Sequence, residues 1–294
     1  MGKLKKIINF IKTFCKEVAL PCSVVKMSAY FDEKGGLIKE NWGDDINYWF
    51  YKEIVNAEII SYDLSLRTRY LNRPYYLGIG SLLTLFSIDN AIVWGSGVMS
   101  KEKKIIGTPL EVRAVRGPLS RQRLLDAGID CPEIYGDPAL LLPLYYTPKV
   151  EKKYKLGVVP HYTDMKSELL EIIKKWDGIH IIKVRGYESW LDVIDQINEC
   201  ELIASSSLHG LIVSEAYGIP NVWVKFSDHT SDDIKFHDFF LSINNDRNPL
   251  ILKEPIDFKR VEVIAKTYRK GDIDLKKLLG ACPFPLKENV VINR

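Results

Sequence analysis

The sequence predicts an α/β protein with two parallel sheets, each flanked by helices, that face each other across a central cleft. Short apolar runs alternate with amphipathic segments along most of the 294 residues, which is the pattern of strand–helix–strand units. A stretch rich in Pro, Tyr and charge at 144–153 interrupts this alternation and therefore marks a linker between two domains. In folds of this class, ligands bind beyond the carboxyl ends of the strands, so we expect a site in the cleft.

The first series of elements lies before this linker. Asp44 precedes the first helix as a candidate cap, and Gly128 is placed to end the second helix. A short strand and turn are expected at 134–142, with the bend at Gly136. The expected strands are 24–31, 75–79, 91–94 and 112–115, and the expected helices are 45–55 and 120–127.

The second series follows the linker with the same alternation, and a final stretch at 257–279 is helical in pattern. The expected strands are 156–160, 180–184, 202–205 and 221–224, and the expected helices are 167–176, 190–200 and 208–217. The predicted organisation is an N-terminal amphipathic helix at 1–23, domains at 24–146 and 147–255, and a helical segment at 256–294 that packs back on the N-terminal half.

Composition narrows the class of protein. Lys and Arg total 41 against 38 Asp and Glu, a net charge of +3, which argues against a broadly basic nucleic-acid-binding surface. The five cysteines are odd in number and form no close C-x-x-C pair, so we expect reduced thiols and no metal site.

The N-terminal segment combines a basic start with apolar residues at helical spacing. Lys12, Lys16 and Glu17 interrupt the apolar stretch, which a secretory signal does not tolerate. We therefore expect a cytoplasmic protein. The helix either docks on the body of the protein or lies on the inner face of an anionic membrane as a peripheral contact.

The sharpest chemical feature is the SSSLHG sequence at 205–210, where a buried strand meets an apolar helix. The start of a helix offers free N–H groups and a positive dipole, which suit an anion such as phosphate. Hydroxyl groups and an imidazole add side-chain donors, so His209 is the candidate proton donor. The candidate anion-binding residues on this turn are Ser206, Ser207, Leu208 and Gly210.

A second feature is a concentration of arginine at 113–123 in a nearly neutral protein. Arg116 lies beside Gly117 and Pro118, which end a predicted strand, and its guanidinium fork suits phosphate or carboxylate. Arg113 alternates with it on the same strand and is the weaker candidate.

Loops after other predicted strands supply the remaining candidates. We expect them to face the cleft, and they are Asn41, Asp44, Gly95, Ser96 and His161. Adjacent aspartates at 44–45 are commonly explained by capping and the helix dipole, so we assign no metal there.

Taken together, these segments resemble the polysaccharide pyruvyl transferase family. The matching sequences are NWGDD (41–45), WGSG (94–97), VRGP (115–118), GDPA (136–139), PHY (160–162), SSLHG (206–210), EAYGIP (215–220) and KFHDFF (235–240). Their order, and their coverage of about 24–245, make the match fairly specific.

The resemblance implies two Rossmann-like domains in a GT-B-like arrangement, the first on the acceptor side and the second on the donor side. It implies transfer of pyruvate from phosphoenolpyruvate, without a cofactor, to two hydroxyls of a sugar or lipid-linked oligosaccharide, giving a cyclic ketal. Arg116 and His209 would carry the donor site. Some members have arginine where this chain has Ser207, and Leu208 would contribute mainly its backbone N–H.

Two other functions stay open on the sequence. A GT-B-like glycosyltransferase would use Glu215 to hold the ribose of a nucleotide sugar. A carbohydrate-binding module would use its tryptophans as stacking surfaces, namely Trp42, Trp49, Trp94 and Trp190. The base for the acceptor hydroxyl is also open, with Asp44 and His161 as candidates.

Overall fold

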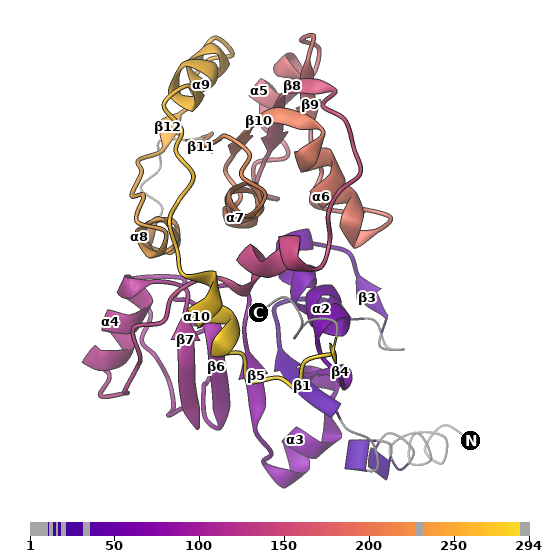
Figure 1. Cartoon of the computed structure of the whole chain (residues 1–294), viewed down its shortest axis with the longest axis vertical. Helices are drawn as coiled ribbons and strands as arrows, with labels where there is room; N and C mark the ends of the chain where they lie inside the picture. The colour runs from indigo at the N-terminus through magenta and orange to yellow at the C-terminus, as the bar shows by residue number, and fades with distance from the viewer. Residues whose placement is uncertain are drawn as a thin grey trace.

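Two five-stranded sheets form the centres of the two halves of the protein (Figure 1). The computed structural model describes residues 11, 14, 15, 17, 18, 22–31, 36–226 and 232–288. The expected N-terminal helix at 1–23, with its membrane contact, therefore lies largely outside the described residues. Among the described residues, no helix is long and apolar enough to cross a bilayer.

Both sheets are parallel throughout their described pairings. The first has the order β4-β1-β5-β6-β7 and contains β1 (Cys22–Lys26), β4 (Glu58–Ser61), β5 (Tyr75–Leu77), β6 (Ala91–Ser96) and β7 (Glu111–Val115). The second has the order β12-β11-β10-β8-β9 and contains β8 (Tyr154–Val159), β9 (Ile179–Ile181), β10 (Cys200–Ser205), β11 (Asn221–Lys225) and β12 (Leu250–Ile251). The predicted mixed α/β class with two parallel sheets is confirmed.

The two sheets share one connectivity. In each, the first strand in the chain lies second from an edge, with the next strand outside it and the later strands on its other side. The chain direction across the sheet therefore reverses between β1 and β5, and again between β8 and β10. Crevices at such reversal points, beyond the carboxyl ends of the strands, are where open α/β sheets bind ligands.

Helices cover the sheets and fill the space between the two halves (Figure 1). They are α2 (Trp42–Ile54), α3 (Leu66–Leu71), α4 (Pro118–Asp126), α5 (Glu168–Ile173), α6 (Trp190–Asn198), α7 (Leu208–Ala216), α8 (Ile234–Ser242), α9 (Asp257–Ala265) and α10 (Leu275–Gly280), with 3₁₀ turns η1 (Tyr62–Leu64) and η2 (Pro138–Leu144) and a small hairpin of β2 (Tyr30–Phe31) and β3 (Leu37–Ile38). One apolar cluster runs continuously from Trp42 and Trp94 in the first half to Leu208 and Trp223 in the second. Apolar burial therefore joins the two halves.

The structure corrects several predicted elements. The strand expected at 24–31 is divided between β1 and β2. The stretch 134–142 contains an isolated bridge at Tyr135 followed by η2, because Pro138 fixes its own φ and Asp137 caps the turn by accepting the N–H of Ala139 at 3.0 Å. The helical segment at 257–279 is two helices: α9 packs on the second sheet through Phe258, whereas α10 packs on the first half.

Candidate active site

The start of α7 lies at the reversal point of the second sheet, directly after β10. Ser205 Oγ donates to the carbonyl of Val159 at 2.9 Å and accepts the N–H of Ser207 at 3.0 Å, which fixes the turn. Ser207 is the N-cap, but its side chain makes no capping hydrogen bond. The first-turn N–H groups of α7, which begin at buried Leu208, are therefore left for another acceptor.

His209 follows in the first turn of α7, and its ring packs on α2. Its Nε2 is buried and has no hydrogen-bond partner among the described residues. Burial lowers the pKa of His209 to about 3, helped by the positive charges of Arg116 and Lys235 and by the nearby His161. The imidazole is thus neutral at pH 7 and has an unpaired nitrogen.

Gly43, in the first turn of α2, makes this placement of the imidazole feasible. A Cβ at Gly43 would lie 2.3 Å from His209 Nδ1, far inside van der Waals contact. Only glycine lets α2 approach the ring this closely. Gly210 does the same on the other side of α7, where a Cβ would lie 2.4 Å from Ser205 Oγ.

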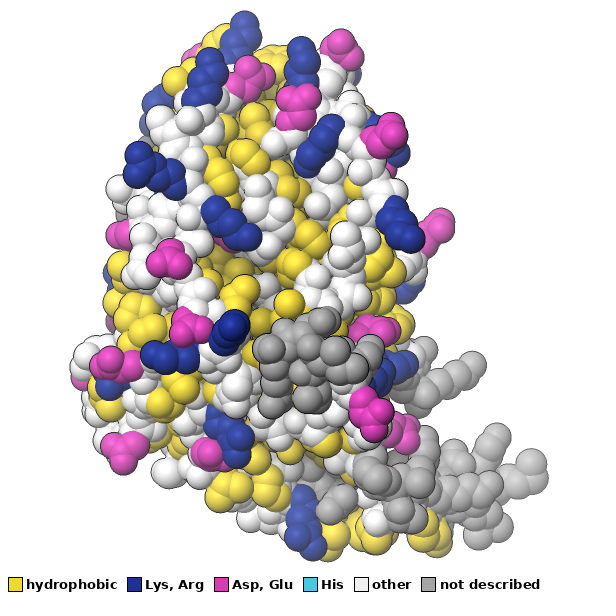
Figure 2. Space-filling model, in the orientation of Figure 1, with side chains coloured by type: hydrophobic (Ala, Val, Ile, Leu, Met, Phe, Trp, Pro, Cys, Tyr) yellow, Lys and Arg dark blue, Asp and Glu magenta, His cyan; other side chains and the backbone are white. Residues whose placement is uncertain are grey.

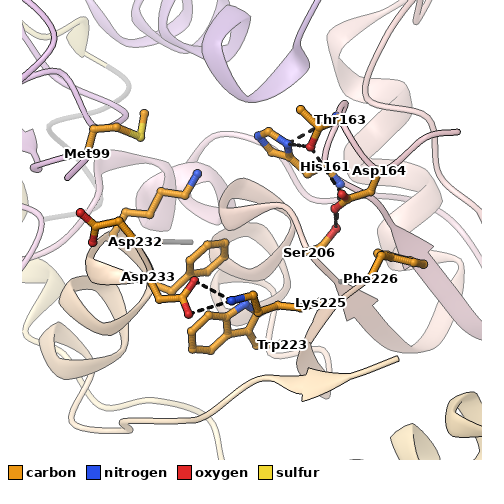
Figure 3. Close-up of a pocket in the computed structure, with 12 residues that line it drawn as sticks. Met99, His161, Thr163, Asp164, Ser206, Trp223, Lys225, Phe226, Asp232 and Asp233 are labelled. Carbon is orange, nitrogen blue, oxygen red and sulfur yellow. Dashed lines mark hydrogen bonds and ion pairs between the residues drawn. The ribbon is translucent and has the colours of Figure 1, made fainter. Parts of the chain in front are cut away.

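A cavity of about 270 Å³ lies beside this turn and receives residues from both halves. Figure 3 shows His161, Thr163 and Asp164 on one side of it and Met99, from the first half, on the opposite side. We call it the donor pocket. It is lined by Met99, His161, Thr163, Asp164, Ser206, Trp223, Lys225, Phe226, Asp232, Asp233, Lys235 and Phe236.

Ser206 links the loop after β8 to the turn before α7. Its Oγ accepts the backbone N–H of His161 at 2.9 Å and donates to Asp164 Oδ2 at 2.6 Å (Figure 3). The Nδ1 atom of His161 lies 2.7 Å from Thr163 Oγ1. Burial, with the charge of Lys235, lowers the pKa of His161 to about 4. His161 is therefore neutral, and it lines the pocket as the sequence predicted it would face the cleft.

Five charged side chains line the donor pocket: Lys225 and Lys235, and Asp164, Asp232 and Asp233. Asp233 is paired with Lys225 at 3.0 Å (Figure 3), and Asp164 is bound to Ser206. Lys235 makes no ion pair with the described residues, and burial, with the charge of Arg116, lowers its pKa. From the sequence, Lys235 was named only as part of the KFHDFF match at 235–240. The signal that could have singled it out is a lysine that directly precedes apolar phenylalanines in this match.

Arg116 lies in a different environment from the one expected. Its side chain is fully buried, with Nη2 3.0 Å from Asp238 Oδ2 in α8 and 2.8 Å from the carbonyl of Val98. Its Nη1 donates to Ser81 Oγ. The guanidinium fork is thus occupied by protein acceptors, and its charge acts on His209 and Lys235 at a distance.

The other residues predicted to bind the donor or face the cleft on the first sheet are not brought into the donor pocket. Arg113 pairs with Glu111 on its own strand at 2.9 Å. Ser96 is buried, where its Oγ donates to the carbonyl of Gly80 at 3.1 Å. Gly95 packs against Pro138, since a Cβ there would lie 2.3 Å from its ring. In the WGSG sequence at 94–97, Gly95 makes room for Pro138 and Gly97 makes room for the side chain of Arg116.

Asn41 and Asp44 lie at the start of α2, facing the cleft. The N-cap is Asn41, whose Oδ1 accepts the N–H of Gly43 at 3.2 Å, so the expectation of Asp44 as the cap is wrong. Asn41 also donates to Asp44 Oδ2 at 2.7 Å. Burial raises the pKa of Asp44, although Asn41 and the charge of Lys235 oppose this shift.

Glu215 is bound by protein groups on both carboxylate oxygens. Oε1 accepts from Arg247 at 2.6 Å and from Asn221 at 2.9 Å. Oε2 accepts from the hydroxyl of Tyr268 at 3.0 Å and from the N–H of Gly271 at 3.1 Å. This carboxylate anchors the C-terminal segment to α7. The described residues contain no group of three or more His, Cys, Asp or Glu suited to holding a metal ion.

Comparison with known proteins gives one family. Its sequence model, described as Polysaccharide pyruvyl transferase, matches residues 41–228. Protein L143 of Acanthamoeba polyphaga mimivirus is 29% identical over 204 residues, which cover 68% of this chain and 69% of that protein. The succinoglycan biosynthesis protein ExoV of Rhizobium meliloti (strain 1021) is 30% identical over 209 residues, which cover 68% of this chain and 60% of that protein. A solved structure from Klebsiella pneumoniae subsp. pneumoniae NTUH-K2044 superposes with a TM-score of 0.45 at 13% identity, over 86% of this chain and 98% of that one.

Proposed function

Since the chain belongs to the polysaccharide pyruvyl transferase family, we propose that it transfers the pyruvyl group of phosphoenolpyruvate onto two hydroxyls of a sugar, forming a cyclic ketal. The similarity to ExoV, a succinoglycan biosynthesis protein, favours an exopolysaccharide or its lipid-linked precursor as acceptor. In this proposal the two halves are GT-B-like domains, with the donor bound mainly by the second half and the acceptor mainly by the first.

The observation that carries the proposal is the Nε2 of His209 in the first turn of α7, which has no partner among the described residues and feels the charge of Lys235. A buried polar atom without a partner is costly, and a small ligand with several anionic oxygens would supply partners to both groups. Phosphoenolpyruvate carries a phosphate and a carboxylate. The free N–H groups of α7 and the ammonium of Lys235 suit these two groups.

The chemistry follows from these contacts. The bound anion raises the pKa of His209, and the imidazolium then donates its proton to the methylene carbon of phosphoenolpyruvate. The adjacent carbon becomes electrophilic, and the oxygen of a first sugar hydroxyl bonds to it as that hydroxyl loses its proton. A second hydroxyl then displaces the phosphate, which leaves with that hydroxyl's proton. The products are the ketal and inorganic phosphate.

Arg116 serves this reaction in the proposal through its charge. Its ion pair with Asp238 holds α8, and therefore Lys235, over the donor pocket. The expected direct contact between Arg116 and the donor requires an anion to share or replace the Asp238 carboxylate. Ser206, Ser207, Leu208 and Gly210 contribute the turn and its N–H groups.

The structure weakens both alternatives. Glu215, the ribose-binding residue of a nucleotide-sugar enzyme, has both oxygens engaged by the protein. Of the four tryptophans of a carbohydrate-binding module, Trp42 and Trp94 are fully buried and offer no surface for stacking a glycan, whereas Trp49 and Trp190 are half-buried. A peripheral membrane contact through 1–23 remains part of the proposal, because Ile11 and Val18 are exposed large apolar side chains.

Calorimetry and turnover test this function. We expect the protein to bind phosphoenolpyruvate and not UDP- or GDP-sugars, and to release phosphate when an acceptor from a glycoside and lipid-linked oligosaccharide screen is added. Mass spectrometry should show the pyruvate ketal. His209→Ala should lower turnover by at least about 100-fold, whereas His180→Ala, on a strand far from this turn in the sequence, should not. Binding of a nucleotide sugar without phosphoenolpyruvate would contradict the proposal.

A further inference from the structure

A second cavity of about 460 Å³ lies in the cleft next to the donor pocket, and it has a different chemical character. We propose that this cavity, here named the acceptor groove, binds the acceptor sugar on Tyr162 and that Asp44 is the base for its attacking hydroxyl. This rests on the proposed function. The groove is lined by Ile38, Glu40, Asn41, Asp44, Tyr162 and Arg185.

The lining of the acceptor groove suits a pyranose. A sugar ring has an apolar C–H face and a rim of hydroxyls, so it needs an aromatic or aliphatic surface together with polar side chains. Tyr162 is 50% exposed, and Ile38 is also exposed. Carboxylates, an amide and a guanidinium supply acceptors and donors for hydroxyls. Glu40 and Arg185 form an ion pair at the rim.

The groove is held in shape by backbone hydrogen bonds between the two halves. The N–H of Trp42 donates to the carbonyl of Val184 at 2.7 Å, and the N–H of Gly186 donates to the carbonyl of Lys39 at 2.9 Å. These bonds fix the segment that carries Glu40 and Asn41 against the one that carries Arg185. The site is therefore preorganised, which lowers the entropic cost of binding.

The acceptor groove and the donor pocket share a wall. His161 lines the donor pocket and Tyr162 lines the groove, and their ring centroids are 4.3 Å apart. Asp44 lines the groove and interacts electrostatically with Lys235 of the donor pocket. A sugar stacked on Tyr162 thus places its hydroxyls at the boundary where phosphoenolpyruvate would lie.

Asp44 is the group at this boundary that can accept a proton. Its Oδ2 is bound to Asn41, and its Oδ1 has no hydrogen-bond partner among the described residues. Burial raises the pKa of Asp44, which makes the carboxylate a stronger base. His161, the other candidate, has Nδ1 engaged with Thr163 and a pKa lowered to about 4, which makes it a weaker one.

In the step assigned to Asp44, its Oδ1 removes the proton of the first sugar hydroxyl. The hydroxyl oxygen forms a bond to the electrophilic carbon of the donor, whose methylene carbon takes its proton from His209. Asp44 then returns its proton to His209 or to solvent, and the second hydroxyl displaces phosphate as described above. One proton enters the new methyl group, and the acceptor supplies it overall.

Two measurements on the full chain test the groove and the base. Saturation-transfer NMR with methyl β-D-glucopyranoside and methyl β-D-galactopyranoside reports acceptor binding without phosphoenolpyruvate. Phosphate release with phosphoenolpyruvate reports turnover. The variants are Tyr162→Ala, Tyr162→Phe and Asp44→Asn, and Tyr70→Ala is the control, because Tyr70 is an exposed tyrosine on α3.

We expect saturation transfer to at least one glycoside in the unmodified protein, a loss of at least about tenfold in affinity in Tyr162→Ala, and near-normal binding in Tyr162→Phe and Tyr70→Ala. Asp44→Asn should keep glycoside affinity within about threefold and phosphoenolpyruvate affinity at least as high, while turnover falls by at least about 100-fold.

The outcomes separate the two proposals. Equal glycoside binding in Tyr162→Ala, or none by the unmodified protein, overturns the groove. Turnover of Asp44→Asn within tenfold of normal overturns the base. If the protein binds glycosides through Tyr162 but binds no phosphoenolpyruvate, the proposed function and the base fail while the sugar site stands.

Discussion

A neutral imidazole whose buried nitrogen has no hydrogen-bond partner among the described residues is a costly feature at the scale of a single residue. Burying a polar atom without a partner destabilises a protein by about 1–3 kcal/mol. His209 has this arrangement at Nε2, although an apolar side chain of similar size would fill the space between α2 and α7. Its retention is explained if a ligand supplies the missing partner, as the donor does in the proposed reaction.

Binding of phosphoenolpyruvate should therefore draw a proton onto His209. The pKa of His209 is about 3 in the unliganded protein, so the group is neutral at pH 7. An anion favours the imidazolium and raises the pKa, and a rise from about 3 to above 7 requires about 5 kcal/mol of differential interaction. Calorimetry at pH 7 in buffers of different ionisation enthalpy should show uptake of up to about one proton.

The matched variants locate this proton. Uptake should vanish in His209→Gln and persist in His180→Gln, whose half-buried imidazole bonds Gln196 in the second half. Unchanged uptake in His209→Gln would assign the proton to another group and remove the support for His209 as the acid.

The sequence predicted which residues gather at the proposed site better than it predicted which side chains those residues contact. His209, Ser206 and His161 are assembled at one reversal point because strand ends in parallel sheets converge. The sequence could not predict that Arg116 pairs with Asp238, because Asp238 lies 122 positions away in the chain in a helix that was not predicted. The N-cap of α2 was also mispredicted. The helix begins three residues earlier than expected, so Asn41 and not Asp44 occupies the position from which a side chain accepts the N–H of Gly43.

At the scale of elements, the contact between α2 and α7 controls the site. Gly43→Ala should displace the imidazole of His209, because the new Cβ would lie 2.3 Å from Nδ1. We expect turnover to fall by at least about tenfold while the melting temperature changes little, since alanine favours a helix by up to about 1 kcal/mol over glycine and offsets part of the strain.

Gly280→Ala is the control for this prediction. Gly280 ends α10, and a Cβ there would meet nothing within 4 Å. Normal turnover in Gly43→Ala would show that the imidazole position is not critical. A large loss of melting temperature instead would mean that the contact serves packing.

Long, strongly patterned elements were predictable, whereas several short ones were not. The helices at α2, α6 and α7 carry continuous apolar faces, and their positions agree with the pattern to within a few residues. The edge strands β4 and β12 are short and depend on pairing with distant segments. Tertiary contacts of this kind leave little local pattern.

At the scale of the whole molecule, one buried ion pair ties the two halves together beside the site. Arg116 on the first half and Asp238 on the second are both fully buried. Breaking such a pair leaves an uncompensated charge, so Asp238→Ala should lower the free energy of unfolding by about 3–5 kcal/mol. Asp238 also accepts the N–H of Ser120 at 2.8 Å, and urea denaturation measures the combined loss.

Glu111→Ala provides the comparison, because its pair with Arg113 is partly exposed. Exposed pairs contribute about 0–1 kcal/mol, so this variant should remain near normal. Similar losses for both variants would show that the Asp238 pair contributes no more than a surface pair. Figure 2 shows acidic and basic side chains intermixed on the face in view.

The same connectivity in both halves places two reversal points on either side of one cleft. The two pockets differ in how deeply their surroundings are buried. The donor pocket lies beside the contact between α2 and α7 that places His209, and beside the buried pair of Arg116 and Asp238. The acceptor groove is bordered by exposed side chains such as Ile38 and Arg185, where substitutions usually change stability by no more than about 0.5 kcal/mol. Under the proposed function, the acceptor groove could therefore change the sugar that it binds at little risk to the fold, while the donor pocket kept its donor.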